Sequence, residues 1–270
     1  TRIANTSPSA ASATADLNGK ALEIACTAIL ERLRVCAAAH FKIAPEAVCL
    51  QEEQVCKNGA PTGMNWNQLI EMAFLERVSL SEHGHYATPV IHFDKTTEKG
   101  HPFAYHVYGL AQLIVRLDCI RGTYVFESVK IVHDFGQSMN PYVDLGQVEG
   151  GLVQGIGWMT LEEVCYDPDG RLASGTLSTY KIPDIYAVPE TVEIEALDTA
   201  GSELAIFKSK AVGEPPLMYG LGAYFAIRDA VLAFRPGAEL GFDAPFTPEK
   251  VLGNLYGLEV EISKGSIPSV

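Results

Sequence analysis

The sequence lacks the grouped cysteines of disulfide-bonded and metal-binding chains. Its six cysteines are scattered, and no two of them form a CxxC pair. In a chain of 270 residues such spacing indicates a reducing compartment, for which we expect the cytoplasm. Iron–sulfur clusters need clustered thiolates, so we do not expect this chain to carry one.

Positive charge is also scarce. The chain has 20 lysines and arginines against 33 acidic residues, which gives a formal net charge of −13. This balance disfavours nucleic acids and anionic membranes, and we expect neither as a partner. No apolar run looks long enough to cross a bilayer, and the polar opening stretch TRIANTSPSA has no apolar core of a signal peptide. Because the chain does not begin with Met, we expect a fragment or a processed subunit.

Motifs of several common enzyme classes are missing as well. The sequence has no dinucleotide-binding GxGxxG after a strand, no P-loop, no GxSxG and no HExxH. Five histidines lie between residues 83 and 106, but their spacing is that of a strand or loop, so we do not predict a metal site there. What the chain does have is 47% hydrophobic residues, enough for one large core or two modest ones.

Hydrophobic periodicity predicts a mixture of helices and strands. We expect a long helix whose N-terminus is capped by Asp16 or Asn18, and a second helix that is capped near Asn65. Two strands are expected to meet in a hairpin at Arg121–Gly122. Further along we expect a glycine-rich helix within 144–167, a strand at 190–198, an apolar helix at 215–234 and a helix at 247–258 capped by Thr247. Since strands and helices do not alternate strictly, the predicted fold class is α+β, with mixed sheets and packed helices.

Three segments are candidates for chemistry, and the first is NTSPSAASATADLNG, residues 5–19. Serines and threonines alternate with alanines just before a predicted helix. This pattern suits an ordinary helix cap. It also suits an anion site, because small side chains let a phosphate approach backbone N–H groups at the positive end of the helix dipole.

The second segment is GQVEGGLVQGIG, residues 146–157. Each glycine inside a helix costs about 1 kcal/mol relative to alanine, so five of them need a reason. A bulky ligand lying against the backbone would be one reason, and tight helix packing would be another. Gln147 and Gln154 are either satisfied core amides or donors to a ligand oxygen.

The third segment is SKAVGEPPLMYG, residues 209–220. Pro215 biases Glu214 away from helical backbone angles, and Gly213 allows close approach of the backbone. A desolvated carboxylate at the mouth of an apolar helix would suit a general base. An exposed glutamate before a proline would be unremarkable, so this segment alone leaves both interpretations open.

Taken together, the segments resemble the molybdenum-binding portion of the xanthine dehydrogenase/xanthine oxidase family of molybdenum hydroxylases. The resemblance covers nearly the whole chain, and its most specific runs are LGQVEG, STYKIP and AVGEPP. It is closer to xanthine dehydrogenases than to the carbon monoxide dehydrogenase branch, while aldehyde oxidases share much of it. It implies that residues 1–270 form the C-terminal portion of the molybdopterin-binding domain, whether as one unit or as two subdomains.

The resemblance also implies roles for single residues. Glu214 matches the catalytic glutamate, and Gln147 matches a glutamine near the oxygen ligand of molybdenum. The loop that holds the phosphate-bearing end of the pterin corresponds to Ala10, Ala11, Ser12, Ala13 and Thr14. No protein ligand to the metal is expected, because the pterin dithiolene holds the molybdenum.

The implied activity is the hydroxylation of hypoxanthine and xanthine to urate, with water as the oxygen source. Its cofactor would be molybdenum-molybdopterin, with [2Fe-2S] and FAD on other domains or subunits. The implied partners are those domains, the remaining molybdenum-domain segment and a purine-like small-molecule substrate. An aldehyde oxidase or another N-heterocycle hydroxylase is the alternative within the family. A cofactor-binding module with no activity of its own is the alternative from another class.

Overall fold

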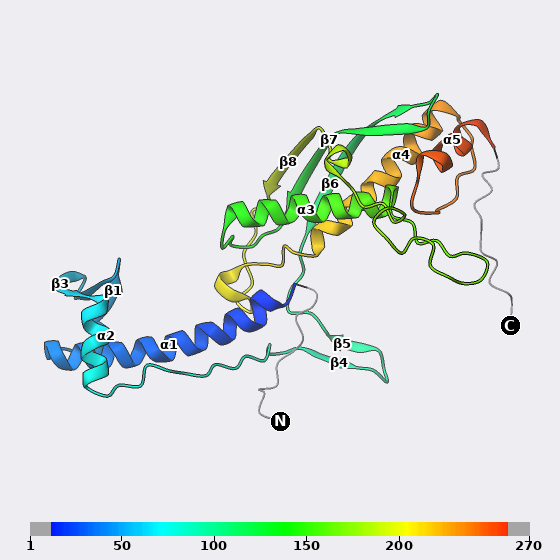
Figure 1. The fold of residues 1–270 in the computed structure, drawn as a ribbon. Coiled ribbons are helices and arrows are strands. Elements are labelled where there is room, and N and C mark those ends of the chain that lie inside the picture. Colours follow the sequence, from blue (N-terminus) through cyan, green and yellow to red (C-terminus); the bar gives the residue numbers. More distant parts are fainter. Residues whose placement is uncertain (1–11, 259–270) are drawn as a thin grey trace. The chain divides into compact units, whose positions relative to one another are not determined.

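The computed structural model describes residues 12–258 and divides them into two compact units (Figure 1). The first unit runs up to Ala104 and also includes Leu204–Ile206. The second unit comprises Tyr105–Glu203 and the chain from Phe207 onward. Ala10 and Ala11, two residues of the predicted pterin loop, lie outside the described residues.

The first unit is built on a long helix, α1 (Thr14–Phe41). The helix begins earlier than the sequence predicts, with Ala13 at the N-cap and no side-chain cap. Asp16 therefore lies inside the first turn, where its negative charge complements the helix dipole. The predicted caps at Asp16 and Asn18 are wrong, because the helix continues through both positions.

A small antiparallel sheet and a second helix complete the packed part of this unit. The strands β1 (Val48–Gln51), β2 (Gln54–Lys57) and β3 (Ala60–Asn65) lie in sequence order after the short helix η1 (Pro45–Ala47). The predicted cap of α2 (Trp66–Leu75) is confirmed as a capping box, in which the Asn65 and Gln68 side chains each accept the other's backbone N–H at 2.9 Å. The buried core comprises Leu33, Cys36, Ala37, Ala38, Val48, Val55, Leu69 and Ala73.

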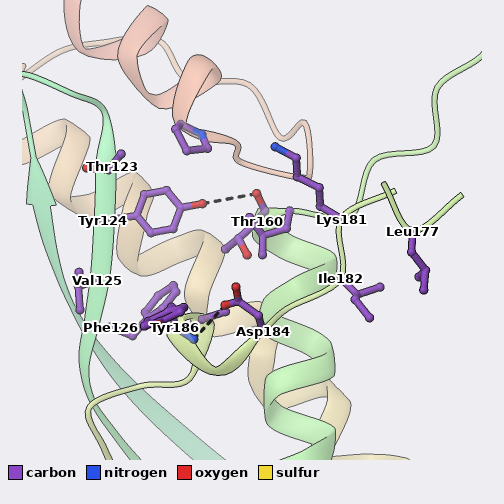
Figure 2. Close-up of a pocket in the computed structure, with 13 residues that line it drawn as sticks. Thr123, Tyr124, Val125, Phe126, Thr160, Leu177, Lys181, Ile182, Asp184 and Tyr186 are labelled. Carbon is purple, nitrogen blue, oxygen red and sulfur yellow. Dashed lines mark hydrogen bonds between the residues drawn. The ribbon is translucent and has the colours of Figure 1, made fainter. Parts of the chain in front are cut away.

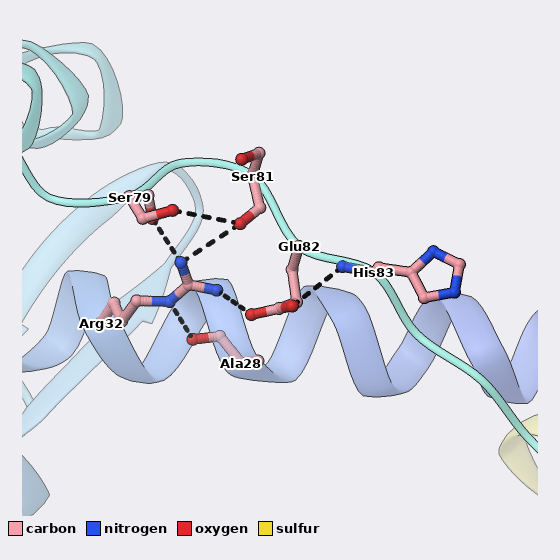
Figure 3. A network of polar contacts seen from close by, with 6 residues as sticks. All are labelled: Ala28, Arg32, Ser79, Ser81, Glu82 and His83. Carbon is pink, nitrogen blue, oxygen red and sulfur yellow. Dashed lines mark hydrogen bonds and ion pairs between the residues drawn. The ribbon is translucent and has the colours of Figure 1, made fainter. Parts of the chain in front are cut away.

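Arg32 fastens the extended chain that follows α2 to the side of α1 (Figure 3). Its guanidinium donates to the carbonyl oxygens of Ser79 at 2.8 Å and Ser81 at 3.2 Å, and to Glu82 Oε2 at 2.5 Å. Beyond this segment the chain forms a short hairpin of β4 (His92–Asp94) and β5 (Lys99–His101). One arginine thus supplies several polar contacts that order a stretch without regular secondary structure.

The second unit contains a three-stranded mixed sheet in the order β6–β7–β8. β6 (Gly109–Asp118) pairs antiparallel with β7 (Thr123–His133), and β8 (Thr191–Ala196) pairs parallel with β7. The predicted hairpin is confirmed. Its turn forms because Asp118 accepts the backbone N–H groups of Ile120 and Arg121, while Gly122 adopts a φ of 70°.

Helices pack on this sheet and enclose the larger core. α4 (Leu221–Phe234) packs against β6, and α3 (Pro141–Thr160) packs against α4 and the short helix η4 (Pro215–Gly220), as Figure 1 shows. The remaining helices of the described residues are η2 (Ile185–Ala187), η3 (Ile206–Lys208) and α5 (Pro248–Tyr256). Thr247 occupies the N-cap position of α5 as predicted, but its side chain makes no cap hydrogen bond. The core includes Phe126, Val129, Ile131, Val148, Leu152, Ile156, Ile227, Val231 and Leu255. Helices on a mixed sheet confirm the α+β class.

The segment Pro215–Phe234 is long and apolar enough, by length and composition alone, to cross a membrane. This corrects the expectation that no apolar run reaches such a length. Two helices of different type make up the segment, since the first turns are the 3₁₀ helix η4 and α4 begins only at Leu221. Ala223, Ile227 and Val231 on α4 are fully buried in the core of the second unit, which accounts for the apolar character of one face.

Candidate active site

The glycine-rich helix α3 is the framework of the candidate site. Asn140 caps it by accepting the backbone N–H of Val143 at 3.3 Å, and Pro141 occupies the first helical position. The five glycines of residues 146–157 do not share one environment. Gly151, Gly155 and Gly157 are buried, whereas Gly146 and Gly150 are exposed.

The buried glycines allow backbone-to-backbone packing. A Cβ added at Gly155 would lie 2.2 Å from the carbonyl oxygen of Leu217 and 3.0 Å from the Cα of Gly220. A Cβ added at Gly151 would lie 2.8 Å from the Cβ of Pro216. Distances below 3.0 Å cannot be accommodated without a shift, so these two glycines exist to seat η4 on α3. Of the two interpretations of the glycine pattern, tight helix packing holds on this face.

The exposed face of α3 has a different character. A Cβ added at Gly146 or Gly150 would meet nothing within 4 Å. Gln147 and Gln154, two helical turns apart, are exposed on the same side of the helix as Gly150. The core-amide interpretation of both glutamines is therefore wrong. This open strip of bare helical backbone flanked by two amides, Gly146–Gln147–Gly150–Gln154, is called the α3 open face below.

Glu214 lies at the N-cap of η4 and is exposed. Its φ of −106° and ψ of −38° are helical, which contradicts the predicted bias away from helical angles. The reason is local, because the Glu214 carbonyl accepts the Leu217 N–H at 3.1 Å and so opens the first turn of η4. Of the two interpretations of this segment, the structure shows the exposed glutamate before a proline.

The register in which η4 packs on α3 indicates where Glu214 lies relative to Gln147. Pro216 contacts Gly151, and Leu217 and Gly220 contact Gly155, so η4 and α3 run in the same direction along their contact. Extending this register back by two residues on η4 and one turn on α3 leads to Glu214 and Gln147. From this register we infer that the two residues, which are 67 positions apart in sequence, lie toward the same end of the α3 open face.

The remaining predicted site residues belong to the first unit. Ser12 has a left-handed φ of 59°, Ala13 is the N-cap of α1, and Thr14 is its first residue. Because Ala13 offers no capping oxygen, the interpretation of this stretch as an ordinary side-chain cap is wrong. The assignment of Ser12, Ala13 and Thr14 to the pterin loop stays a prediction.

Next to the Glu214 segment lies a buried polar cluster that the sequence analysis missed. The Lys210 ammonium donates to Asp134 Oδ2 at 2.5 Å, and Thr199 Oγ1 donates to Asp134 Oδ1. Asp134 is fully buried, and only 8% of the Lys210 side chain is exposed. Burial alone would raise the pKa of Asp134, but the hydrogen bonds from Lys210, Thr199 and the Gly136 N–H outweigh it and hold the pKa below its ordinary value.

A second buried pair adjoins this cluster. His133 Nδ1 lies 2.6 Å from the Tyr219 hydroxyl, and the imidazole is fully buried. Burial lowers the pKa of His133, although the nearby Asp134 carboxylate acts in the opposite direction. Burial also raises the pKa of Tyr219 to about 12. Both groups are therefore neutral at physiological pH.

A separate pocket lies at the other end of α3 (Figure 2). It has a volume of about 450 Å³ and is lined by Tyr124, Phe126, Thr160, Lys181, Asp184 and Tyr186 among others. The Tyr124 hydroxyl donates to the carbonyl oxygen of Phe246 at 2.9 Å, so it is already used in the fold. The pocket lies beside Thr160, the last residue of α3, whereas the α3 open face begins at Gly146 near the start of the helix. The pocket is therefore not part of the candidate site.

The histidines of residues 83–106 do not form a cluster of three or more potential metal ligands, nor does any other group of His, Cys, Asp and Glu within residues 12–258. His92 and His101 stand opposite each other across β4 and β5, with ring centroids 5.5 Å apart. All six cysteines, which the described range includes, are free thiols.

Comparison with known proteins points to one family. The family model described as the molybdopterin cofactor-binding domain matches residues 1–189. Xanthine dehydrogenase/oxidase of Felis catus is 40% identical over 256 residues, and xanthine dehydrogenase of Drosophila pseudoobscura pseudoobscura is 38% identical over 245 residues. These matches cover 92% and 90% of this chain but only 18% and 17% of the relatives. The chain thus spans less than a fifth of the curated relatives it matches.

Solved structures agree at the level of the fold. Quinoline 2-oxidoreductase from Pseudomonas putida 86 matches with a TM-score of 0.69 at 24% identity, over 86% of this chain and 29% of that one. The aldehyde oxidoreductase from Desulfovibrio desulfuricans matches with a TM-score of 0.69 at 25% identity, over 93% of this chain and 24% of that one.

Proposed function

Because the chain belongs to the family of the molybdopterin cofactor-binding domain, we propose that it forms part of the active site of a xanthine dehydrogenase-type molybdenum hydroxylase. The observation that carries the proposal is the α3 open face beside Glu214. Gly146 and Gly150 are not needed for any packing within the described residues, yet each weakens the helix by about 1 kcal/mol relative to alanine. A ligand that lies against the helix would explain both.

The described residues fit a molybdenum–molybdopterin group. The bare backbone at Gly146 and Gly150 leaves room for a flat ring system, and Gln147 and Gln154 offer amide donors on the same side. The dithiolene of the pterin holds the metal, so the fit does not require a cluster of protein ligands. The pterin loop, Ala10 to Thr14, would supply the contacts to the phosphate-bearing end.

Each residue of the site would have a distinct task. When bound, the cofactor supplies the redox chemistry of hydroxylation. The Gln147 side-chain N–H would donate a hydrogen bond to an oxygen of that group and so fix its orientation. Glu214 acts as the general base and accepts a proton at a carboxylate oxygen, which its exposure leaves accessible.

The overall reaction replaces a C–H bond of the substrate by C–OH. Water supplies the oxygen, and two electrons and two protons leave, so that atoms and charge balance. The proposed substrates are hypoxanthine and xanthine, which would yield urate, and the electrons pass to [2Fe-2S] and FAD centres on other domains or subunits. The proposed compartment is the cytoplasm, in keeping with six free cysteines.

Glu214→Gln in the full enzyme tests the role of the base. The amide is nearly isosteric but cannot accept the proton, so we expect kcat with xanthine to fall by about 10²–10⁴-fold while molybdenum content stays at the wild-type level. The matched control is Glu195→Gln, an exposed carboxylate on β8, which should leave kcat unchanged. A loss below about tenfold for Glu214→Gln would remove the general-base assignment.

The substrate class needs a separate measurement. Steady-state kcat/KM would be compared for xanthine, hypoxanthine, an aromatic aldehyde and quinoline with the same enzyme. We expect xanthine and hypoxanthine to have the highest kcat/KM of the four substrates. If the aldehyde or quinoline had the highest kcat/KM, the enzyme would instead be assigned as an aldehyde oxidase or another N-heterocycle hydroxylase. No turnover of any of them by a molybdenum-loaded enzyme would favour a cofactor-binding role without catalysis.

A further inference from the structure

The segment that leads to Glu214 is tied to the end of β7. Ser209 forms a bridge with Gly136, and the Lys210 N–H donates to the Phe135 carbonyl at 2.9 Å. The Gln137 N–H donates in turn to the Lys208 carbonyl at 2.9 Å. Beyond these bonds, a hydrogen bond between His133 and the Ala211 backbone continues the attachment. Side-chain contacts then hold the segment on either side of Glu214.

On the N-terminal side of Glu214, called the near side below, the buried Asp134–Lys210 ion pair holds this segment. Asp134 follows directly on β7, and Lys210 stands four residues before Glu214. Thr199 and the Gly136 N–H complete the hydrogen bonds of the carboxylate. The Lys210 ammonium also lies 5.7 Å from the centre of the Tyr108 ring, which limits its movement on the remaining side.

On the C-terminal side of Glu214, called the far side below, His133 holds Tyr219 through the hydrogen bond of 2.6 Å between His133 Nδ1 and the Tyr219 hydroxyl. Tyr219 stands five residues after Glu214, in η4. A Cβ added at Gly109 would lie 1.8 Å from the Tyr219 hydroxyl oxygen, so the phenol tip sits directly on the β6 backbone. The hydroxyl therefore has a single position, fixed by His133 and by Gly109.

We propose that Asp134–Lys210 and His133–Tyr219 form a two-point clamp that positions Glu214 over the end of the α3 open face. All four are positioning residues, and the inference rests on the proposed function of Glu214. Consecutive residues of β7 and its extension, His133 and Asp134, thus reach both sides of the base. The C-terminal end of β7, the central strand of the sheet, therefore anchors the segment that carries the base.

Stability alone does not explain this arrangement. Replacing a buried ion pair by apolar side chains of similar size is often neutral or stabilising, so a buried pair is a poor device for holding a fold together. Its hydrogen bonds do restrict geometry, because each has a narrow range of lengths and angles. Proton transfer is sensitive to such geometry, and a displacement of about 1 Å can reduce the rate on the order of a hundredfold.

The test uses two variants of the full enzyme that avoid leaving a buried charge unpaired. Asp134→Asn combined with Lys210→Met removes both charges of the near side and keeps similar volumes. Tyr219→Phe removes only the hydroxyl of the far side. Lys130→Met is the matched control, since Lys130 forms an exposed ion pair with Glu193 on the same sheet at 2.9 Å. Molybdenum content and melting temperature are recorded for all of them.

Two readouts separate positioning from mere folding. Hydrogen–deuterium exchange of the peptide containing residues 208–216 should become at least about tenfold faster in both clamp variants, with exchange of β6 and α4 unchanged. kcat with xanthine should fall by about 10- to 100-fold, while KM changes by less than about threefold. The Lys130→Met enzyme should match the wild type in both readouts.

Unchanged exchange in the 208–216 peptide would overturn the clamp. Faster exchange with an undiminished kcat would overturn the claim that the clamp positions a base. A fully active Glu214→Gln enzyme would instead overturn the proposed function. In that case the exchange measurement still decides whether the two pairs hold the segment, so the two failures are distinguishable.

Discussion

At the scale of single residues, His133 carries the clearest pH dependence in the second unit. The imidazole is fully buried. Burial lowers its pKa, while the charge of Asp134, a hydrogen bond with the Ala211 backbone and the charge of Asp144 raise it by less. The unfolded chain therefore binds a proton at His133 at a higher pH than the folded chain does.

We predict that the free energy of unfolding falls as the pH drops below the ordinary histidine pKa of 6.5. The contribution of neutral His133 is fully present above that value and is lost as the pH approaches the lower pKa of the folded state. Urea unfolding of the full-length protein at pH 7.5 and pH 5.5 measures the difference.

The variant His133→Gln keeps a hydrogen-bonding group toward Tyr219 but cannot titrate, so its two unfolding curves should lie closer together. The exposed His40 on α1 provides the matched control, and His40→Gln should retain the wild-type difference. An unchanged pH difference in His133→Gln would contradict the prediction. The Asp134–Lys210 pair does not interfere, because the lowered pKa of Asp134 places its own loss of stability at a more acidic pH.

At the scale of elements, the two faces of α3 predict opposite effects of the same substitution. Gly155→Ala should destabilise the protein, because the new Cβ would lie 2.2 Å from the Leu217 carbonyl oxygen and η4 would have to move. We expect a loss of about 1–3 kcal/mol, as for other overpacked sites. Gly150→Ala meets nothing within 4 Å and should stabilise the helix by about 0.5–1 kcal/mol.

The Gly150→Ala variant also tests whether the cofactor lies against the α3 open face. If the α3 open face lies against the cofactor, Gly150→Ala should lower the molybdenum content of the purified full enzyme even though its melting temperature is not reduced. Elemental analysis and calorimetry on one sample measure both quantities. A Gly150→Ala enzyme with full molybdenum content and wild-type turnover would show that the open face has another purpose.

Local signals account for the elements that the sequence predicted well. The hairpin follows from Asp118 and Gly122, and the second helix follows from the reciprocal cap of Asn65 and Gln68, all within a few residues of each other. The three short strands of residues 48–65 were not predicted. They are four to six residues long, too short for an alternating pattern to stand out.

The candidate site could be predicted only in part, for a physical reason. Motifs identified Glu214 and Gln147, but their approach depends on how η4 seats on α3, which is a tertiary contact. The Asp134–Lys210 pair joins residues 76 positions apart. No local pattern reports such a pairing, although a strand that ends in an aspartate with aromatic and aliphatic neighbours is a signal that the charge needs a partner. The sequence likewise could not show which glycines of α3 are buried and which are exposed, because this depends on where η4 packs.

At the scale of the whole molecule, the chain covers only 18% of its relative from Felis catus. We predict that the 270-residue chain, produced by itself, has no xanthine-oxidising activity and retains no molybdopterin through gel filtration. The α3 open face is exposed to solvent, and a pterin bound there would be covered on one side only. Elemental analysis of the isolated chain decides the question, and stoichiometric molybdenum would contradict the prediction.

The parallel pairing of β7 and β8 has a consequence for how the second unit comes to be formed. β6 and β7 are joined by a tight turn and can pair within microseconds, as hairpins do. β8 must wait until the chain of residues 134–190, which contains α3, has brought its ends together at an entropic cost of roughly 3–4 kcal/mol. Pulse-labelling hydrogen exchange during refolding should therefore protect β6 before β8. Val192 and Ile194 cannot pack beside β7 earlier, so a ribosome must have released the chain beyond β8 before the sheet that frames Glu214 is complete.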